Sequence, residues 1–174
     1  MKRKPYSAFD RHSIDSFKSA QKSSVCLVLD NIRSGLNIGS IFRTADAFGI
    51  EKIGLCGISA TPDSREVLKS ALGATESMSW QYFESTSACL LQLKSEGWNI
   101  VGIEQLDESI ALDQYQFQSD KKYALVFGNE VRGLSDDALP LLDAAIEIPQ
   151  FGTKHSFNVA VSAAIVLWEH HRQH

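Results

Sequence analysis

"NIRSGLNIGSIFRTADAFGI" (residues 31–50) follows the first strongly apolar run of the chain and carries the start of a helical pattern. Three residues of this stretch, Asn37, Gly39 and Arg43, are not needed in a helix that only covers a sheet. Asn37 could simply cap the helix, because asparagine is among the best N-cap residues. Arg43 stands among apolar neighbours, so it must pair, extend into solvent or bind an anion. Taken alone, a solvated arginine is the commonest of these cases.

Outward from this stretch, apolar runs alternate with helical patterns along the chain. The predicted strands are residues 25–30, 52–57, 98–104, 123–128 and 144–149, with a weaker sixth at 78–83. The predicted helices are residues 13–22, 38–49, 64–73, 86–97, 135–143 and 156–171. Gly49, Gly73 and Gly97 fall where C-terminal helix caps belong. Strands that alternate with helices predict an α/β fold in which helices flank a mostly parallel sheet.

Length and composition fit one globular domain. The chain has 174 residues, of which 44% are apolar and 22% charged, which is ordinary for a soluble protein with a full-sized core. We expect a single domain over residues 23–174, preceded by a short basic and helical extension over residues 1–22. Its basic cluster, Lys2, Arg3 and Lys4, is expected to contact phosphates. The net charge of −4 argues against nucleic-acid binding over the whole surface.

Several absences indicate a cytoplasmic protein. The sequence has no run of about 18 apolar residues, so no membrane span is expected. The basic N-terminus has no apolar segment behind it and does not resemble a signal peptide. Cys26 and Cys56 stand in strand-like runs, and the third cysteine, Cys89, leaves an odd number without a CxxC pair. This usage predicts buried thiols in a reducing compartment.

Two further stretches place polar residues where predicted strands end. "YALVFGNEVRGLS" (residues 123–135) continues a buried strand into Gly128 and Glu130, and such loops bind ligands in α/β proteins. "IPQFGTKHSFNVAVSAAI" (residues 148–165) leads from a strand into a helix, with Ser156 as a predicted cap and Asn158 in the first turn. Taken singly, a tight turn and simple capping would explain both stretches.

The last predicted helix, residues 156–171, is apolar on every side until Trp168. Such a helix must be buried all round, either in the centre of the core or against a second subunit. Two-fold symmetry is the default for an interface of this kind.

Together, the three stretches resemble the motifs of a known superfamily. They read N-x-G-x-x-x-R (residues 37–43), F-G-N-E-x-x-G (127–133) and I-P-x-x-G-x-x-x-S-x-N-V (148–159), in that order. This set is similar to the SpoU/TrmH-type branch of the SPOUT superfamily, RNA 2′-O-ribose methyltransferases, over residues 24–170. Small departures are Gln150, where the family often has methionine, Phe157, where leucine is usual, and Ala160, where serine is common.

The resemblance implies S-adenosylmethionine as cofactor, a C-terminal trefoil knot and a homodimer. It implies that Gly128, Ile148 and Phe157 line the cofactor pocket, with a looser match for residues 103–105. By the same resemblance, the catalytic residues are Asn37, Arg43, Glu130, Ser156 and Asn158. The implied substrate is the ribose of an RNA. The small size of the extension favours transfer RNA over ribosomal RNA, and we expect the methylated nucleotide to be a guanosine.

Other classes of function were weighed against this one. A nicotinamide oxidoreductase would need G-x-G-x-x-G after the first strand, and Gly35 and Gly39 have the wrong spacing. No metal site is expected, because His170, His171 and His174 are predicted to be solvated at the end of the chain. Two alternatives stay open: an RNA-binding assembly factor that methylates nothing, and an enzyme that methylates a base nitrogen.

Overall fold

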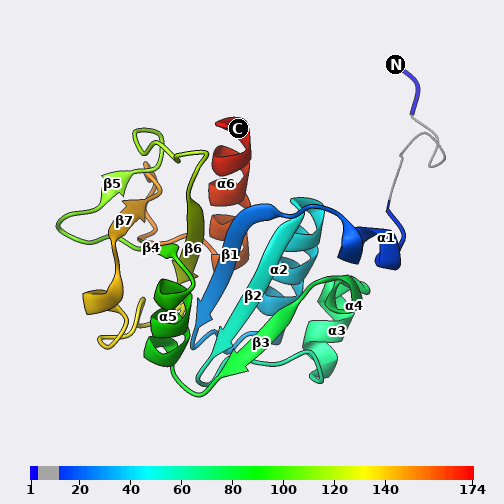
Figure 1. Cartoon of the computed structure of the whole chain (residues 1–174). Helices are drawn as coiled ribbons and strands as arrows, with labels where there is room; N and C mark the ends of the chain where they lie inside the picture. The colour runs from blue at the N-terminus through cyan, green and yellow to red at the C-terminus, as the bar shows by residue number, and fades with distance from the viewer. Residues whose placement is uncertain (4–11) are drawn as a thin grey trace.

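The computed structural model describes residues 1–3 and 12–174 and contains one parallel sheet of seven strands (Figure 1). The strand order is β3-β2-β1-β6-β4-β7-β5, and every pairing is parallel. The strands are β1 Ser23–Asp30, β2 Ile50–Cys56, β3 Trp80–Phe83, β4 Trp98–Ile103, β5 Ile110–Ala111, β6 Lys122–Phe127 and β7 Ala144–Glu147. The predicted α/β fold with a parallel sheet is therefore confirmed.

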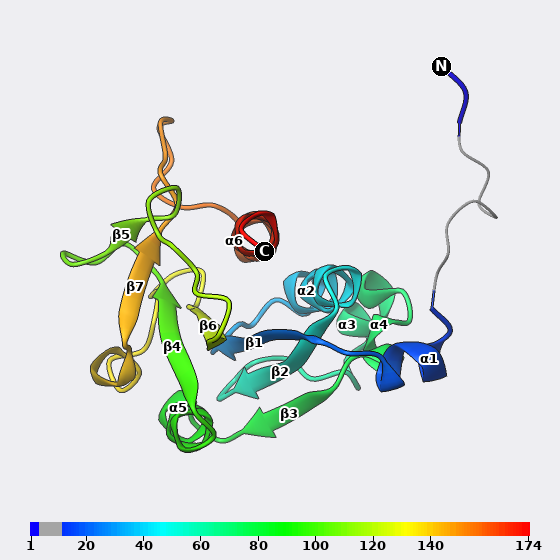
Figure 2. The same ribbon diagram turned by 45° about the horizontal axis from the view of Figure 1, so that its top comes forward.

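Helices cover both faces of the sheet (Figure 2). They are α1 Ile14–Ser19, α2 Gly35–Ala47, α3 Arg65–Ala71, α4 Ala74–Ser77, α5 Thr86–Ser95 and α6 Val159–Arg172, with a short 3-10 helix at Leu139–Leu141. Figure 2 shows α2, α3, α4 and α6 on one face and α5 on the other. Each face buries its own apolar cluster against the sheet.

Two helix predictions need correction. Residues 135–143 do not form a helix beyond the 3-10 turn at Leu139–Leu141, because Pro140 supplies no backbone N–H to continue one. The predicted N-terminal helix is shorter than expected and spans Ile14–Ser19. Lys4 and Arg11 of the basic extension lie outside the described residues, while Lys2 and Arg3 are exposed.

Gly39, from the opening stretch, has a packing role. A Cβ atom at this position would lie 2.1 Å from Ser70 Oγ and 2.4 Å from the carbonyl oxygen of Val67. Both neighbours belong to α3, so the two helices approach closely only because residue 39 lacks a side chain. This contact sets the position of α2, which carries Asn37 and Arg43.

The three cysteines are buried and unpaired, as the sequence predicted. Burial raises the pKa of the Cys26 thiol to about 12, so this side chain stays protonated and packs as a small apolar group. In the part of the chain that the structure describes, no helix is both long and apolar enough to cross a membrane.

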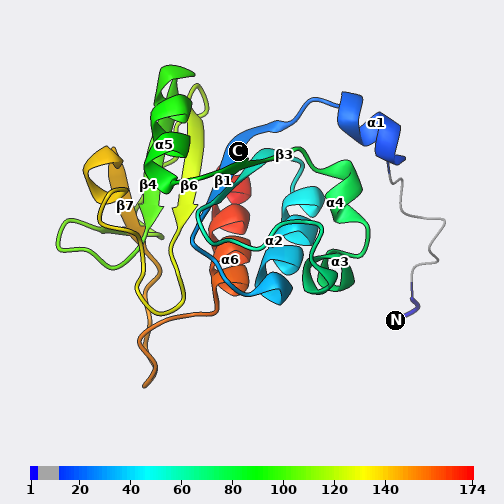
Figure 3. The same cartoon turned by 90° about the horizontal axis from the view of Figure 1, so that it is seen from below.

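Within one copy of the chain, helix α6 is not buried on every side, so the alternative of a central core helix is wrong and burial against a second subunit stays a prediction. Val159, Ala163, Val166 and Leu167 are buried against the sheet and α2, whereas Val161 and Trp168 are 47% and 58% exposed. In Figure 3 the segment after β7 crosses to α6, which then runs beside α2. The monomer therefore covers one face of an all-round apolar helix and leaves the other open. The trefoil knot implied by the resemblance stays a prediction.

His170 was predicted to be solvated, and this is wrong. Its side chain is only 8% exposed, and its ring lies 4.9 Å from the ring of Phe117 and 6.1 Å from that of Tyr123. It lies one helical turn after the buried Val166, so it continues the buried stripe of α6. Burial, and then the neighbouring His174 and His171, lower the pKa of His170 from 6.5 to about 4.

This buried histidine predicts a loss of stability in mild acid. The unfolded chain takes up the His170 proton below pH 6.5, whereas the folded chain does so only near pH 4. Stability should therefore fall between these pH values, by up to about 3 kcal/mol for this one group. Urea unfolding of the protein and of His170→Leu at several pH values measures the difference. Equal pH dependence of the two proteins between pH 6.5 and 4 would contradict the assignment.

Candidate active site

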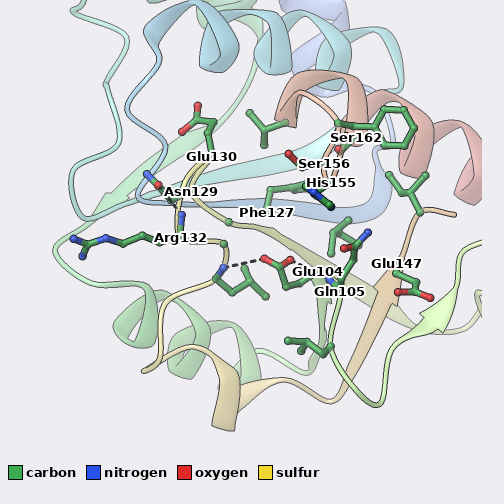
Figure 4. Close-up of a pocket in the computed structure, with 18 of the residues that line it drawn as sticks. Glu104, Gln105, Phe127, Asn129, Glu130, Arg132, Glu147, His155, Ser156 and Ser162 are labelled. Carbon is green, nitrogen blue, oxygen red and sulfur yellow. Dashed lines mark hydrogen bonds between the residues drawn. The ribbon is translucent and has the colours of Figure 1, made fainter. Parts of the chain in front are cut away.

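A pocket of about 550 Å³ opens at the carboxyl ends of β4, β6 and β7 (Figure 4). This is the edge at which open parallel sheets bind ligands. Its walls come from the residues that follow the three strands and from the segment before α6. The lining residues named in advance from the sequence are Ile103, Glu104, Gln105, Gly128, Glu130, Ile148, Ser156 and Phe157. All three residues predicted to bind a cofactor therefore share one cavity.

The loop after β6 is closed tightly by its own backbone. Asn129 and Gly133 exchange two backbone hydrogen bonds of 2.9 Å, and Asn129 Oδ1 accepts from the N–H of Val131 at 3.0 Å. A Cβ atom on Gly128 would lie 2.3 Å from the carbonyl carbon of Gly133. Residue 128 therefore lacks a side chain because the returning loop occupies that space.

Buried Asp30, at the end of β1, anchors this loop to the sheet. Its carboxylate has no exposed surface and accepts from Ser135 N at 2.7 Å, Ser135 Oγ at 2.8 Å, Asn31 Nδ2 at 2.7 Å and Thr86 Oγ1 at 2.5 Å. Asn129 Nδ2 adds a bond to the carbonyl oxygen of Asn31, at 2.7 Å. Four donors compensate the burial of the charge, so the loop that carries Glu130 has a fixed position.

Glu104 fixes the same loop from the other side. Its carboxylate accepts from Leu134 N at 3.2 Å and from Gln105 N at 3.0 Å. Figure 4 marks hydrogen bonds of Glu104 as dashed lines. Residues 103–105, which matched the cofactor-binding motif only loosely, therefore line the pocket.

Three of the predicted catalytic residues form one chain of hydrogen bonds. Asn158 Nδ2 donates to Asn37 Oδ1 at 3.0 Å, and Asn37 Nδ2 donates to Glu130 Oε1 at 3.0 Å. These residues come from the start of α6, the first turn of α2 and the loop after β6. The chain of bonds runs from the pocket, which Glu130 lines, to a groove between α2 and α6, which Asn37 and Asn158 line.

The helix caps differ from those predicted. Ser34 caps α2 by accepting from the N–H of Asn37, so Asn37 is not a cap and its side chain is free to join the site. Asn158, rather than Ser156, caps α6, with Oδ1 accepting from Ala160 N at 3.0 Å and Val161 N at 3.4 Å. Ser156 is exposed and lines the pocket.

Arg43 lies apart from these residues within the monomer. It is exposed on α2, about 9 Å further along the helix axis than Asn37, and is not part of the pocket wall. Among the described residues it has no ion-pair partner. The structure thus gathers Asn37, Glu130 and Asn158, places Ser156 in the adjoining pocket, and leaves Arg43 on the surface beside the groove.

The pocket is acidic. Four carboxylates line it, those of Glu104, Glu130, Asp136 and Glu147, against one arginine, Arg132. Apolar side chains, among them Phe127, Ile146 and Val159, complete the wall. Over the described ranges, no group of three or more histidine, cysteine or carboxylate side chains could hold a metal ion. This lining suits a ligand that combines an apolar ring with positive charge, and it repels a polyanion.

Asp30 was missed by the sequence analysis. The available signal was a lone carboxylate that ends the apolar run "VCLVLD" at the carboxyl edge of a buried strand. A charge in such a position must be paired or hydrogen-bonded, which makes it a candidate anchor for the neighbouring loops.

Comparison with known proteins matches residues 24–168 to the model of the SpoU rRNA Methylase family. A 23S rRNA (guanosine-2′-O-)-methyltransferase, RlmB, of Neisseria meningitidis is 34% identical over 93% of this chain and 64% of its own length. A tRNA (guanosine(18)-2′-O)-methyltransferase, TARBP1, of Mus musculus is 31% identical over 87% of this chain and 10% of its own length. The chain thus spans less than two thirds of these curated relatives.

Solved structures show the same architecture. An rRNA methyltransferase from Sinorhizobium meliloti, crystallised with bound S-adenosylmethionine, superposes with a TM-score of 0.80 at 28% identity. The match covers 90% of this chain and 59% of that one. Residues 24–168, which match the family model, contain the three strand ends and most of α6.

Proposed function

The chain belongs to the SpoU rRNA methylase family, and we propose that it is an S-adenosylmethionine-dependent RNA 2′-O-methyltransferase. One observation carries the proposal: the hydrogen-bonded chain from Asn158 through Asn37 to Glu130, beside a pocket of cofactor size. These side chains come from three separate segments and contribute little to the core. Their convergence is therefore better explained by a catalytic role than by a contribution to the stability of the fold.

The pocket fits S-adenosylmethionine. Its apolar wall, including Ile148 and Phe157, suits the adenine ring, and its carboxylates suit the positive sulfonium. When bound, the cofactor supplies a methyl group activated by that positive charge. We propose that Gly128, Ile148 and Phe157 hold it, together with residues 103–105.

The protein groups then orient the RNA and stabilise its charge. Glu130 fixes the orientation of the Asn37 amide, whose carbonyl in turn holds Asn158, so these side chains form a rigid edge between pocket and groove. The ribose 2′-hydroxyl must lose its proton as its oxygen reacts, and we propose that this proton passes to solvent water. We propose that Arg43 stabilises the developing negative oxygen as a charged donor, and that Ser156 contacts the same ribose.

The finer identity of the substrate is part of the proposal. We propose a guanosine of transfer RNA, with ribosomal RNA as the second candidate. The mouse relative is named for the former class and the Neisseria relative for the latter. The buried, unpaired cysteines favour a reducing compartment, for which we propose the cytoplasm.

Two measurements test the function. Calorimetry should detect S-adenosylmethionine binding; no measurable binding would favour a non-catalytic RNA-binding factor. Methyl transfer from labelled cofactor to transfer RNA and ribosomal RNA, followed by nuclease digestion, should give 2′-O-methyl nucleosides. Label recovered on a base instead would support the alternative of a base-methylating enzyme.

We also propose that the protein is a homodimer built on the open face of α6. A groove of about 590 Å³ lies between α2 and α6, with Ala160, Val161, Ala164, Ile165 and Trp168 on its α6 side. An open apolar face of this kind is typical of an interface between two copies related by two-fold symmetry. Because Asn37 and Asn158 line the same groove, the second subunit would complete the surroundings of the site.

Replacing Ala164 by glutamate should raise the dimer dissociation constant at least about a hundredfold, because an unpaired charge would be buried in the interface. Sedimentation velocity measures the change. Ala88→Glu, on the exposed side of α5, is the matched control and should leave the dimer intact. A monomeric unaltered protein would contradict the proposal.

A further inference from the structure

Since the pocket is acidic and the chain carries a net charge of −4, RNA phosphates must be held elsewhere. We infer that Arg33, Arg65 and Arg132 form the phosphate-binding surface that presents RNA to the pocket. This surface, the arginine track, rests on the proposed function and specifies how the RNA is held. It shares no residue with the basic cluster of residues 2–4.

Each arginine of the track comes from a different loop or helix start at one edge of the sheet. Arg33 follows β1, Arg65 begins α3 after the loop that follows β2, and Arg132 lies in the loop after β6. The strand order places β2, β1 and β6 side by side, and β6 adjoins β4, where the pocket opens. The track therefore leads along the edge of the sheet to the pocket. Figure 3 views the molecule from the side at which β1 and β2 end.

Hydrogen bonds and close packing hold these three segments together. Ile32 N donates to Ser59 Oγ at 2.9 Å, and Ala60 N donates to the carbonyl oxygen of Ile32 at 3.2 Å, which joins the loops after β1 and β2. Asn129 Nδ2 donates to the carbonyl oxygen of Asn31 at 2.7 Å, which joins the loop after β6. The three arginines consequently extend from one rigid platform.

The start of α3 packs against the start of α2. A Cβ atom on Gly35 would lie 2.8 Å from the Cβ of Glu66. Glu66 is the immediate neighbour of Arg65, and Gly35 is two residues after Arg33. The two arginines therefore lie on adjoining segments of the edge.

The arginines of the track are exposed and not neutralised. None of the three forms an ion pair within residues 1–3 and 12–174, where the pairs are Lys52–Glu96, Lys94–Asp143 and Arg172–Glu169. The nearby carboxylates have other partners or none: Glu130 accepts from Asn37, Asp63 from Thr61, and Glu66 has no cationic partner. Figure 4 shows the Arg132 side chain extending away from the pocket. Exposed guanidinium groups without an ion-pair partner suit the phosphates of an RNA backbone.

The test removes the three charges together. The triple variant R33A/R65A/R132A should bind total transfer RNA about a hundredfold more weakly, and each single variant about fivefold more weakly. The slope of log affinity against log salt should fall by roughly one for each arginine removed. Methyl transfer by the double variant R33A/R65A, which leaves the pocket wall unchanged, should show a raised KM for RNA, with kcat nearly unchanged at saturating RNA.

Three controls separate this role from a loss of folding or of function. The double variant R33A/R65A, which leaves the pocket-lining Arg132 in place, should bind S-adenosylmethionine as the unaltered protein does. Replacing the three arginines of the track by lysine should keep most of the slope of log affinity against log salt, because a contact to a phosphate depends mainly on the positive charge. Lys121→Ala removes one exposed charge at the opposite end of β6, and it should leave both the affinity for RNA and its salt dependence unchanged.

An unchanged salt slope in the triple variant, with RNA still tightly bound, would overturn the arginine track while leaving the methyltransferase proposal in place. An unaltered protein that binds S-adenosylmethionine but no RNA would likewise overturn the track. If it binds neither, the proposed function itself fails.

Discussion

Arg43→Ala is expected to lower methyl transfer to RNA at least about a hundredfold, the effect of removing one charged donor from a transition state. A guanidinium group stays protonated in water, so Arg43 acts best as a charged donor to the developing alkoxide rather than as a base. Arg43→Lys should recover little activity, because a point charge does not reproduce the planar fork of donors.

Single-turnover transfer of labelled methyl groups to the RNA measures this effect. Cofactor affinity should be unchanged, because Arg43 is not part of the pocket wall. Arg172→Ala is a matched control, since it removes an exposed arginine paired with Glu169 at the far end of α6. Near-normal transfer by Arg43→Ala would show that the catalytic centre has been assigned wrongly.

Asp30→Ala should destabilise the folded protein by about 3–5 kcal/mol. The change leaves the donors of Asn31, Thr86 and Ser135 without their acceptor in a buried position, and each unsatisfied group has a desolvation cost. The loop with Glu130 and Arg132 would lose its anchor, so methyl transfer should fall as well. Asp30→Asn should lose less stability than Asp30→Ala. It should still be less stable than the unaltered protein, because its amide nitrogen would face N–H and O–H donors where an oxygen now accepts.

Urea unfolding at pH 7 measures the first effect. Asp136→Ala is the control, because Asp136 lies on the same loop but is exposed, and its loss should change stability by less than about 0.5 kcal/mol. A loss of less than 1 kcal/mol in Asp30→Ala would contradict the role of Asp30 as an anchor.

The sequence alone contained the order of the elements and the location of the site. Alternation of apolar runs with helical patterns is a local property, and it predicted six of the seven strands. The two-residue β5 is too short to give such a pattern. Because parallel strands end at one edge, residues that follow them had to meet there, as Gly128, Ile148 and Ser156 do in the pocket.

Tertiary structure decided which side chains touch and which faces stay open. Local pattern identified α6 as apolar all round, but only the packing of that helix showed that Val161 and Trp168 stay exposed while His170 is buried. The bonds of Asp30 to Thr86 and Ser135 join residues far apart in sequence, and so does the bond between Asn37 and Asn158. The pattern of a strand or helix depends on neighbours within a few residues, whereas hydrogen-bond partners and buried faces depend on segments that meet only after the whole chain has folded.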